Sequence, residues 1–153
     1  QLTPEIELRT LETNGTGFVR MVTAAFRYFA QQKGGHLAVI SSIAGTKGLG
    51  AAPAYSATKR FQNTYIDALE QLAHIQKLPI RFTDIRPGFV ATGLLNDGKH
   101  YLMLMHTEKV ARHIVCALEK KKRIVVIDWR YRILVALWRL IPPFFWKRLP
   151  VRN

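Results

Sequence analysis

The chain has 153 residues, 48% of them hydrophobic and 22% charged, which predicts one globular domain with its own core and excludes a disordered chain. Its single cysteine excludes an intrachain disulfide framework and is typical of a reducing, cytoplasmic location. The net charge of +13 comes mainly from residues 120–153, which hold ten Lys/Arg against one Asp/Glu, so the basicity belongs to the end of the chain.

The first thirty residues are expected to form an interrupted helix. Thr3 is placed as its N-cap with Pro4 in the first turn, and apolar residues at helical spacing continue to about Gln32. Residues 14–17 are Asn-Gly-Thr-Gly, four poor helix formers in a row. They predict a kink or a boundary within this helix.

Strands and helices then alternate along the chain. Apolar runs and helical spacing predict elements at 36–42 (strand), 54–75 (helix), 80–85 (strand), 107–122 (helix) and 123–128 (strand). The strand at 36–42 is apolar enough to be buried on both faces, and Thr107 is expected to cap the later helix. This order predicts an α/β fold with a parallel sheet and right-handed crossovers.

Tyr55 and Lys59 are the most informative pair of residues in the sequence. Four positions apart in the expected helix, they share one face, with their Cβ atoms about 5–6 Å apart. The ammonium stabilises the ionised form of the phenol, which a tyrosine needs in order to exchange protons near neutral pH. Ser42, at the end of the preceding strand, is placed to hydrogen-bond a substrate oxygen. Together with a hydride carrier, these groups are suited to interconverting an alcohol and a carbonyl.

Four sequence elements in this order resemble the short-chain dehydrogenase/reductase (SDR) family: Asn14-Gly-Thr-Gly17, Ile40-Ser-Ser-Ile-Ala-Gly45, Tyr55-Ser-Ala-Thr-Lys59 and Pro87-Gly-Phe-Val-Ala-Thr92. The resemblance covers roughly residues 4 to 128 and implies a doubly wound, Rossmann-like parallel sheet, to which we assign residues 1–128. Of that sheet the chain would supply the C-terminal half, with about three parallel strands and flanking helices. The glycine-rich turn that holds the cofactor phosphates in such folds is not found in this sequence. We therefore expect the 153-residue segment to be inactive by itself.

The resemblance also implies a role for each matching residue. Tyr55 would be the general acid/base, Lys59 would tune it and hold the nicotinamide ribose, and Ser42, preferred over Ser41, would orient the substrate oxygen. Asn14 would maintain a water-linked proton path to Lys59. The nicotinamide end of the cofactor would be lined by Pro87, Gly88, Val90 and Thr92. Each residue taken singly also has a purely structural interpretation. Asn14 is typical of a helix breaker, Ser42 of a strand end and Lys59 of a solvated helix position. The pair Pro87-Gly88 is typical of an ordinary turn.

Cofactor and partners follow from the same resemblance. The cofactor would be NAD or NADP, with NADP preferred, and a homodimer or homotetramer would form through the helices that carry Asn14 and Tyr55. A lipophilic carbonyl or alcohol substrate is expected because the loops 43–53 and 93–106 are apolar, the second through Leu94, Leu95, Tyr101, Leu102, Met103, Leu104 and Met105. The five histidines lack metal-ligand spacing, so we expect no metal site. The alternative is a catalytically incomplete fragment that acts as a membrane- or partner-docking module.

Residues 129–153 are expected to be a basic, aromatic C-terminal extension. Within them, residues 129–149 combine Arg and Lys with Trp and Phe, and the apolar stretch is too short to span a bilayer. As a helix they would carry arginines on one side and, on the other, Ile133, Leu134, Leu137, Trp138 and Ile141. This pattern predicts a helix lying on a membrane surface, with packing over the substrate pocket or in a subunit interface as an equal alternative. No nucleic-acid-binding motif accompanies it, so we expect no nucleic acid partner.

Overall fold

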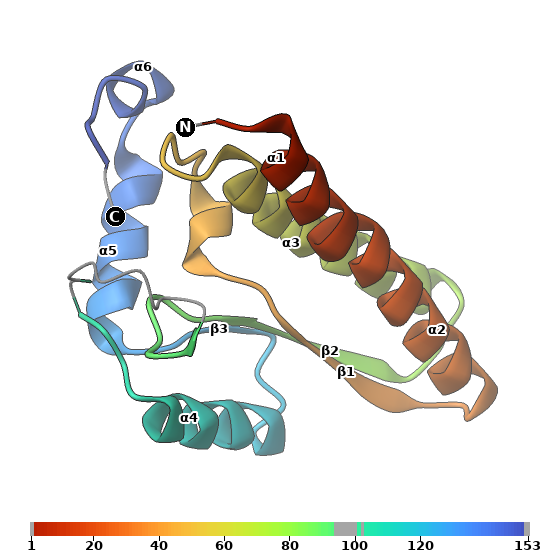
Figure 1. Ribbon diagram of the computed structural model, residues 1–153. Coiled ribbons are helices and arrows are strands. Elements are labelled where there is room, and N and C mark those ends of the chain that lie inside the picture. Colours follow the sequence, from red (N-terminus) through yellow and green to blue (C-terminus); the bar gives the residue numbers. More distant parts are fainter. Residues whose placement is uncertain (1, 94–100, 102, 152–153) are drawn as a thin grey trace.

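The computed structural model describes residues 2–93, 101 and 103–151, and its centre is a three-stranded parallel sheet (Figure 1). The strand order is β1-β2-β3, with β1 at Gly35–Ile40, β2 at Ile80–Arg86 and β3 at Ile124–Val126. Helix α3 (Pro53–Ile75) connects β1 to β2, and α4 (Thr107–Glu119) lies between β2 and β3. The predicted α/β fold with three parallel strands is confirmed.

The N-terminal helix is continuous, and the predicted interruption has a specific form. Helix α1 (Pro4–Leu11) runs into a π-helical segment at Glu12–Gly17, which runs into α2 (Phe18–Gln31). A π-helical turn holds one residue more than an α-helical turn, so the chain stays helical while its phase changes. Thr3 occupies the N-cap position as predicted, although its side chain makes no capping hydrogen bond.

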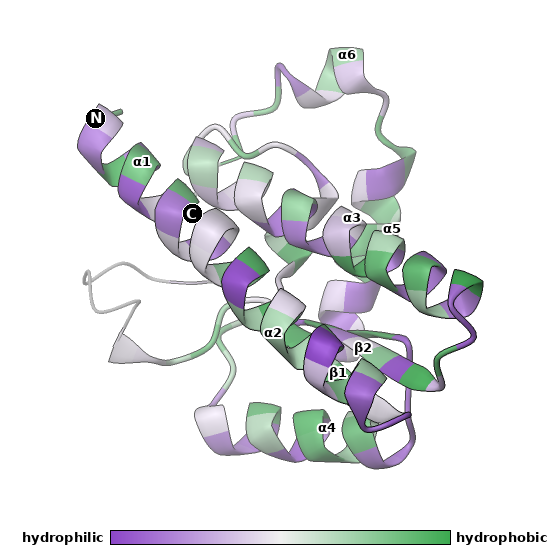
Figure 2. Cartoon of the chain, turned by 90° about the vertical axis from the view of Figure 1, so that its right-hand side faces the viewer, coloured by the Kyte–Doolittle hydropathy of each residue, from purple (hydrophilic) through white to green (hydrophobic). Residues whose placement is uncertain are grey.

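Two hydrophobic clusters lie on opposite faces of the sheet. Helices α2 and α3 cover one face and run side by side there, while α4 lies on the other face (Figure 2). The cluster under α2 and α3 contains Val22, Phe26, Leu37, Val39, Ile66, Ala73, Ile80 and Phe82. The opposite cluster joins β2 and β3 to α4 and to a helix after β3, and contains Ile43, Ile85, Met105, Val110, Ala117, Val125, Ile127, Tyr131 and Val135.

Strand β1 differs from the prediction in its burial. We expected it to be buried on both faces, but only Leu37 and Val39 are buried, whereas Ala38 is exposed and Ile40 is 56% exposed. Within the described chain β1 pairs with β2 alone. On the face away from α2 and α3, helices α4 and α5 cover β2 and β3. The prediction was wrong because composition does not show how far a covering layer extends.

The second half of the chain shows smaller corrections. His106, and not Thr107, stands at the N-cap of α4, and the helix ends at Glu119 because Lys121 adopts a positive φ of 49°. Helix α5 (Trp129–Leu140) has Asp128 as its N-cap, whose carboxylate accepts a hydrogen bond from the Arg130 amide. A short helix, α6 (Pro143–Trp146), follows. Within the described ranges, we find no helix with the length and hydrophobicity needed to cross a membrane.

The expected single apolar side of the C-terminal helix is wrong. Tyr131 and Val135 of α5 are buried in the second cluster, whereas Ile133 and Leu137 are exposed on the outside. The helix therefore has two apolar faces, one packed against the sheet and one turned outward. The division of the chain at residue 128 stays a prediction.

Candidate active site

Four of the predicted site residues lie at the carboxyl edge of the sheet. Ser42 follows β1, Pro87 follows β2, and Tyr55 and Lys59 lie in the first two turns of α3. The Ser42 hydroxyl accepts a hydrogen bond from the Ala44 amide (3.1 Å) and donates one to the Pro87 carbonyl (3.4 Å). Since parallel strands end at the same edge, residues from two loops and one helix meet there.

Lys59 is buried beside Tyr55. Its ammonium nitrogen lies 5.6 Å from the centre of the Tyr55 ring, and it donates hydrogen bonds to the Ile40 carbonyl (3.4 Å) and to Gln62 Oε1 (3.1 Å). Burial lowers the pKa of Lys59, and the negative charge of Asp84 partly opposes this effect. An ammonium has three N–H donors, and within the described chain two are used. The third is available to a hydroxyl such as that of a ribose.

Gln62 links Asn14 to Lys59. Its side-chain amide donates a hydrogen bond to the Asn14 carbonyl (2.8 Å), while its Oε1 accepts from Lys59. Asn14 itself bonds Thr58 on α3 through its side chain (3.4 Å). Gln62 was not predicted, although its place three residues after Lys59 puts both on one helix face. The proposed proton path from Asn14 to Lys59 stays a prediction.

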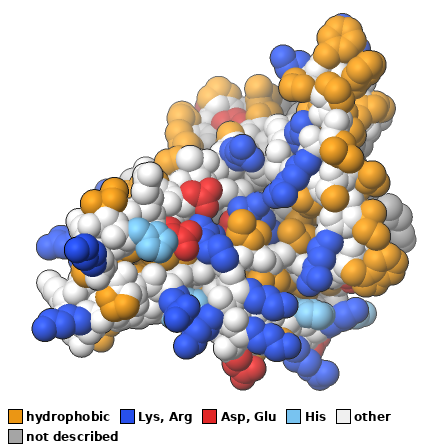
Figure 3. Space-filling view, turned by 180° about the vertical axis from the view of Figure 1, so that it is seen from behind, with side chains coloured by type: hydrophobic (Ala, Val, Ile, Leu, Met, Phe, Trp, Pro, Cys, Tyr) orange, Lys and Arg blue, Asp and Glu red, His pale blue; other side chains and the backbone are white. Residues whose placement is uncertain are grey.

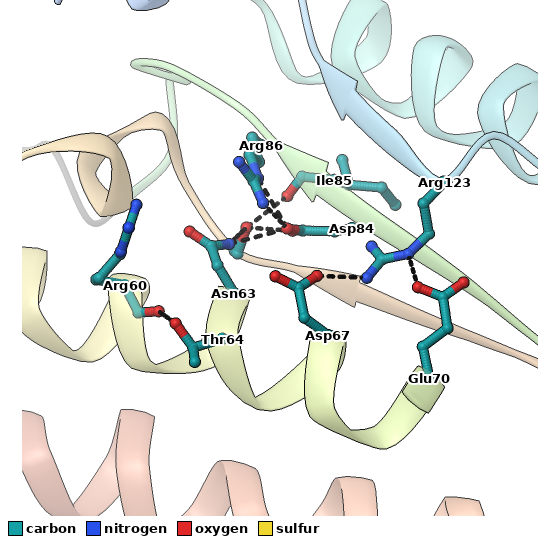
Figure 4. Close-up of polar contacts among 10 residues, drawn as sticks. Arg60, Asn63, Thr64, Asp67, Glu70, Asp84, Ile85, Arg86 and Arg123 are labelled. Atoms are coloured by element: carbon teal, nitrogen blue, oxygen red, sulfur yellow. Dashed lines mark hydrogen bonds and ion pairs between the residues drawn. The ribbon is translucent and has the colours of Figure 1, made fainter. Parts of the chain in front are cut away.

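A buried polar cluster, which the sequence did not reveal, lies directly behind the site. It consists of Asn63, Asp84 and Arg86, which Figure 4 shows, together with Ser41, and it connects the end of β1 to α3 and β2. Arg86 binds the Asp84 carboxylate through Nε (2.7 Å) and Nη2 (2.5 Å), and Asn63 Nδ2 donates to the same carboxylate (2.9 Å). The Ser41 hydroxyl donates to Asp84 and accepts from Asn63 (3.0 Å).

The members of this cluster lie within four residues of predicted site residues along the chain. Ser41 precedes Ser42, Asn63 lies one helical turn after Lys59, and Arg86 precedes Pro87. Asp84 is 0% exposed, so its charge is stable there only because Arg86 and two hydrogen-bond donors surround it. The cluster therefore fixes the relative positions of the three elements that carry the site.

Two glycines allow the chain to approach neighbouring elements closely. A Cβ atom at Gly45 would lie 2.5 Å from Asn63 Oδ1 and 2.9 Å from the Lys59 carbonyl carbon. A Cβ at Gly88 would lie 2.2 Å from the ring of Tyr131. Glycine is therefore required where the loop after β1 crosses α3 and where the loop after β2 meets α5.

Tyr131 of α5 holds the loop after β2 in place. Its hydroxyl accepts a hydrogen bond from the Phe89 amide (3.1 Å) and donates one to the Met103 carbonyl (3.2 Å). Burial raises the pKa of Tyr131, which keeps the phenol in the neutral form that can donate. No sequence signal distinguished Tyr131 from its aromatic neighbours.

The four residues predicted to line the nicotinamide end are not equivalent in the structure. Pro87, Gly88 and Val90 are half-buried, and Val90 forms an isolated parallel bridge with Met105. Thr92 is exposed. Of the residues expected to make the second loop apolar, Tyr101 and Met105 are buried, while three lie outside the described residues: Leu94, Leu95 and Leu102.

Other sites in the described chain are less suited to chemistry. A cavity of about 560 Å³ lies between residues 45–50 and the start of α3, and its lining includes Ser56 and Arg60 but not Ser42, Tyr55 or Lys59. Across the described residues there is no group of three or more His, Cys, Asp or Glu that could hold a metal ion.

Comparison with known proteins points to one family. The model of the short chain dehydrogenase family matches residues 2–101. Dehydrogenase/reductase SDR family member 7B of Bos taurus is 33% identical over 162 residues, which cover 97% of this chain and 49% of the relative. The chain spans about half the length of the curated relatives it matches.

Solved structures share the fold. A short-chain dehydrogenase from Burkholderia cenocepacia in complex with NADP aligns with a TM-score of 0.79 at 18% identity, over 98% of this chain and 61% of that one. A short-chain dehydrogenase from Sphingobium yanoikuyae in complex with NADPH aligns with a TM-score of 0.74, also at 18% identity, over 100% of this chain and 60% of that one. These likenesses confirm the Rossmann-like architecture.

Proposed function

Because the chain belongs to the short-chain dehydrogenase family, we propose that it carries the proton-transfer part of an NAD(P)-dependent oxidoreductase site that interconverts an alcohol and a carbonyl. One observation carries the proposal. Tyr55 and the buried Lys59 share one face of α3, at the carboxyl edge where Ser42 and Pro87 also meet.

Each residue has a definite task in this reaction. When a carbonyl is reduced, Tyr55 gives its proton to the carbonyl oxygen as the carbon receives hydride, and in the reverse direction Tyr55 takes the hydroxyl proton. Ser42 orients the substrate oxygen by a hydrogen bond, and the Lys59 ammonium stabilises the ionised phenol that remains. Asn14 maintains a water-linked path that returns the proton to Lys59, and Gln62 connects Lys59 to the helix that carries Asn14.

The residues present fit the nicotinamide end of a dinucleotide. A bound NAD(P) would supply the hydride transfer. The remaining donor of Lys59 would bind its ribose, and Pro87, Gly88, Val90 and Thr92 would line its nicotinamide end. We favour NADP over NAD because two similar solved structures hold NADP or NADPH. The expected substrate is a lipophilic carbonyl or alcohol, since Tyr101 and Met105 place apolar side chains in the loop that follows β2.

The test is the oxidation of NADPH with a panel of lipophilic ketones and aldehydes. In the full-length protein, Tyr55→Phe should lower kcat by about 10²–10⁴-fold, because the proton donor is removed while the ring remains. Tyr65→Phe is the matched control, since Tyr65 lies on the same helix and contacts Thr23. Near-normal turnover by the Tyr55 variant would exclude the proposed role.

A second candidate function is a docking module without catalysis. It is favoured by the outward apolar face of α5 and by the edge of β1, which within the described chain has no strand on its second side. Calorimetric titration of NADPH into the 153-residue chain tests whether this segment binds the cofactor, and only a positive result decides between the two functions. Absence of binding agrees with a docking module and with our expectation that the segment is inactive alone, whereas micromolar binding would contradict both.

We further propose that two or four copies associate through the N-terminal helix and α3. An apolar groove between α1 and α3, lined by Leu8, Leu11 and Phe61, supports this arrangement because all three side chains are exposed in the single chain. Sedimentation velocity of the wild type and of Leu11→Asp would test it. The cytoplasmic location stays a prediction.

A further inference from the structure

The C-terminal helix α5 is apolar on the side that faces away from the sheet. Trp129, Ile133, Leu137 and Leu140 are 67%, 52%, 55% and 77% exposed. At about 100° per residue these four fall within one quarter of the helix circumference, opposite the buried Tyr131. This outward stripe is therefore a regular feature of the helix and not a set of scattered exposed residues.

Helix α6 extends the same surface and is held firmly in place. Trp146 is buried, and its indole N–H donates to the Gly48 carbonyl (2.7 Å). The Lys47 ammonium donates to the Ile141 carbonyl (2.8 Å), which fixes the turn between the two helices. With Trp146 turned inward, Phe144 and Phe145 project outward, each 60% exposed.

Cations border this surface, and no acid interrupts it. Residues 129–153 contain six Lys/Arg and no Asp or Glu. Arg132 and Arg139 lie along one flank of the outward stripe of α5, and the Arg148 guanidinium lies 3.7 Å from the centre of the Phe144 ring. Figure 3 shows the hydrophobic side chains gathered along this side of the molecule with Lys and Arg side chains next to them.

We propose that this surface, formed by Trp129, Ile133, Leu137, Leu140, Phe144 and Phe145 with the adjoining cations, docks on an anionic membrane surface. Contiguous exposed apolar surface of this kind, bordered by charged side chains, is typical of interaction sites. A partly inserted helix buries its Trp, Phe and Leu side chains at the boundary of the acyl chains while its Lys and Arg side chains reach the lipid phosphates. The charge pattern selects an anionic membrane over an apolar protein groove, because a purely apolar partner would leave these cations unpaired.

Docking would bring the site close to lipid. The contacts of Trp146 and Lys47 attach the membrane-facing helices to residues 45–50, which lie in the loop directly after Ser42. A substrate dissolved in the bilayer would then enter beside that loop. This consequence rests on the proposed function, but the docking itself does not.

The experiment is flotation of the full 153-residue chain with vesicles of phosphatidylcholine alone and of phosphatidylcholine with phosphatidylserine. The wild type should float with the anionic vesicles, and Phe144→Ser/Phe145→Ser should bind about tenfold more weakly or worse because two inserted rings are lost. Arg132→Gln/Arg139→Gln should bind about thirtyfold more weakly at low salt. Met21→Ser/Ile75→Ser is the matched control, since both side chains are more than 70% exposed and lie outside the tail.

Several outcomes would overturn the proposal. Circular dichroism first establishes that each variant is folded. A folded wild type that stays at the bottom with anionic vesicles, or that floats equally with neutral ones, contradicts an anionic membrane as the partner. Equal flotation of the Phe144/Phe145 variant and the wild type would do the same. If sedimentation shows a dimer that this variant dissociates, while no vesicle binds, the surface is an interface between copies. Because no arm measures turnover, failure here leaves the oxidoreductase proposal untouched.

Discussion

The chain contains the same charged pattern twice, at Asp84-Ile85-Arg86 and at Asp128-Trp129-Arg130. The acid is buried in both places, but the exposure of the arginine and the element that carries the pair differ. At the end of β2 the side chains of the pair are 0% and 9% exposed and lie 2.5 Å apart. At the start of α5 the acid is buried, but the arginine side chain is 39% exposed, and the pair lies 2.9 Å apart.

The difference shows that local geometry brings the two side chains together, and that burial of both partners decides how much the pair contributes to stability. In a strand, residues two apart point to the same face, so Asp84 and Arg86 are driven together beneath α3. At a helix start, the acid accepts the amide of the second helical residue, and the side chain of that residue folds back onto it. The first pair holds three elements at the candidate site, whereas the second starts one helix.

The largest loss of stability is expected from Asp84→Asn, which breaks the buried pair. The change keeps the shape but leaves Arg86 as an unpaired, buried charge, which should lower the free energy of unfolding by about 3–5 kcal/mol. Urea unfolding at pH 7 measures it. The matched control is Asp67→Asn, where a 62% exposed acid pairs with Arg123 and the loss should be below about 1 kcal/mol. Equal losses in the two variants would mean that burial does not distinguish the pairs.

Gly45→Ala tests how tightly the loop after β1 must lie against the buried cluster. The new methyl group would meet Asn63 and the Lys59 backbone, so a cost of about 1–3 kcal/mol is expected. Gly48→Ala, three residues further along the same loop, meets nothing within 4 Å and should be close to neutral. Chemical unfolding of both variants decides, and a neutral Gly45 variant would show that the loop can move away from α3.

Asp128→Asn probes the open pair and should cost about 1–2 kcal/mol at pH 7, because the depressed pKa of Asp128 corresponds to at most about 2.4 kcal/mol and Asn can still cap α5. The hydrogen bond from Arg130 lowers the pKa of Asp128 from 3.8 to about 2. Stability from this depressed pKa is present above pH 3.8 and is lost as the pH falls toward 2. The difference between wild type and variant should therefore shrink in that window, and a difference that is constant with pH would count against the pair.

The smallest change in the free energy of unfolding is expected at His36, which lies in β1 at the edge of the described sheet. Burial, followed by the charges of Lys121 and Arg81, lowers the pKa of His36 below 6.5. The folded state therefore binds this proton less readily than the unfolded state, so the stability it contributes is present above pH 6.5 and is lost at lower pH. His36→Gln should flatten the decrease in unfolding free energy between about pH 7 and pH 5. An unchanged slope would assign that decrease to other groups.

The sequence predicted the features that depend on spacing within one element. The order of strands and helices, the shared face of Tyr55 and Lys59, and the irregular helix at residues 14–17 all follow from local periodicity and residue type. The buried cluster did not follow, because Ser41 meets Asp84 only through the register in which Val39 pairs with Asp84 and Ile40 with Ile85. A single sequence contains no record of such a register.

The faces of the C-terminal helix were missed for a related reason. Hydropathy gives equal weight to Leu134 and Ile133, but only contact with the sheet separates the half-buried Leu134 from the exposed Ile133. Tyr131 was overlooked because its role depends on Gly88 and Phe89, more than forty residues earlier in the chain.

The π-helical segment at Glu12–Gly17 also determines how the site helix begins. Helix α3 has no side-chain cap of its own, and its Ala54 amide is instead bound by the Glu7 carboxylate of α1 (2.8 Å). Deleting one residue from the segment would restore regular α-helical bonding but rotate α1 by about 100° around its axis. Glu7 would then turn away from Ala54, the residue before Tyr55. The one extra residue in the π-helical segment thus sets the direction in which Glu7 points. It thereby allows Glu7 to cap the helix that carries the candidate catalytic tyrosine.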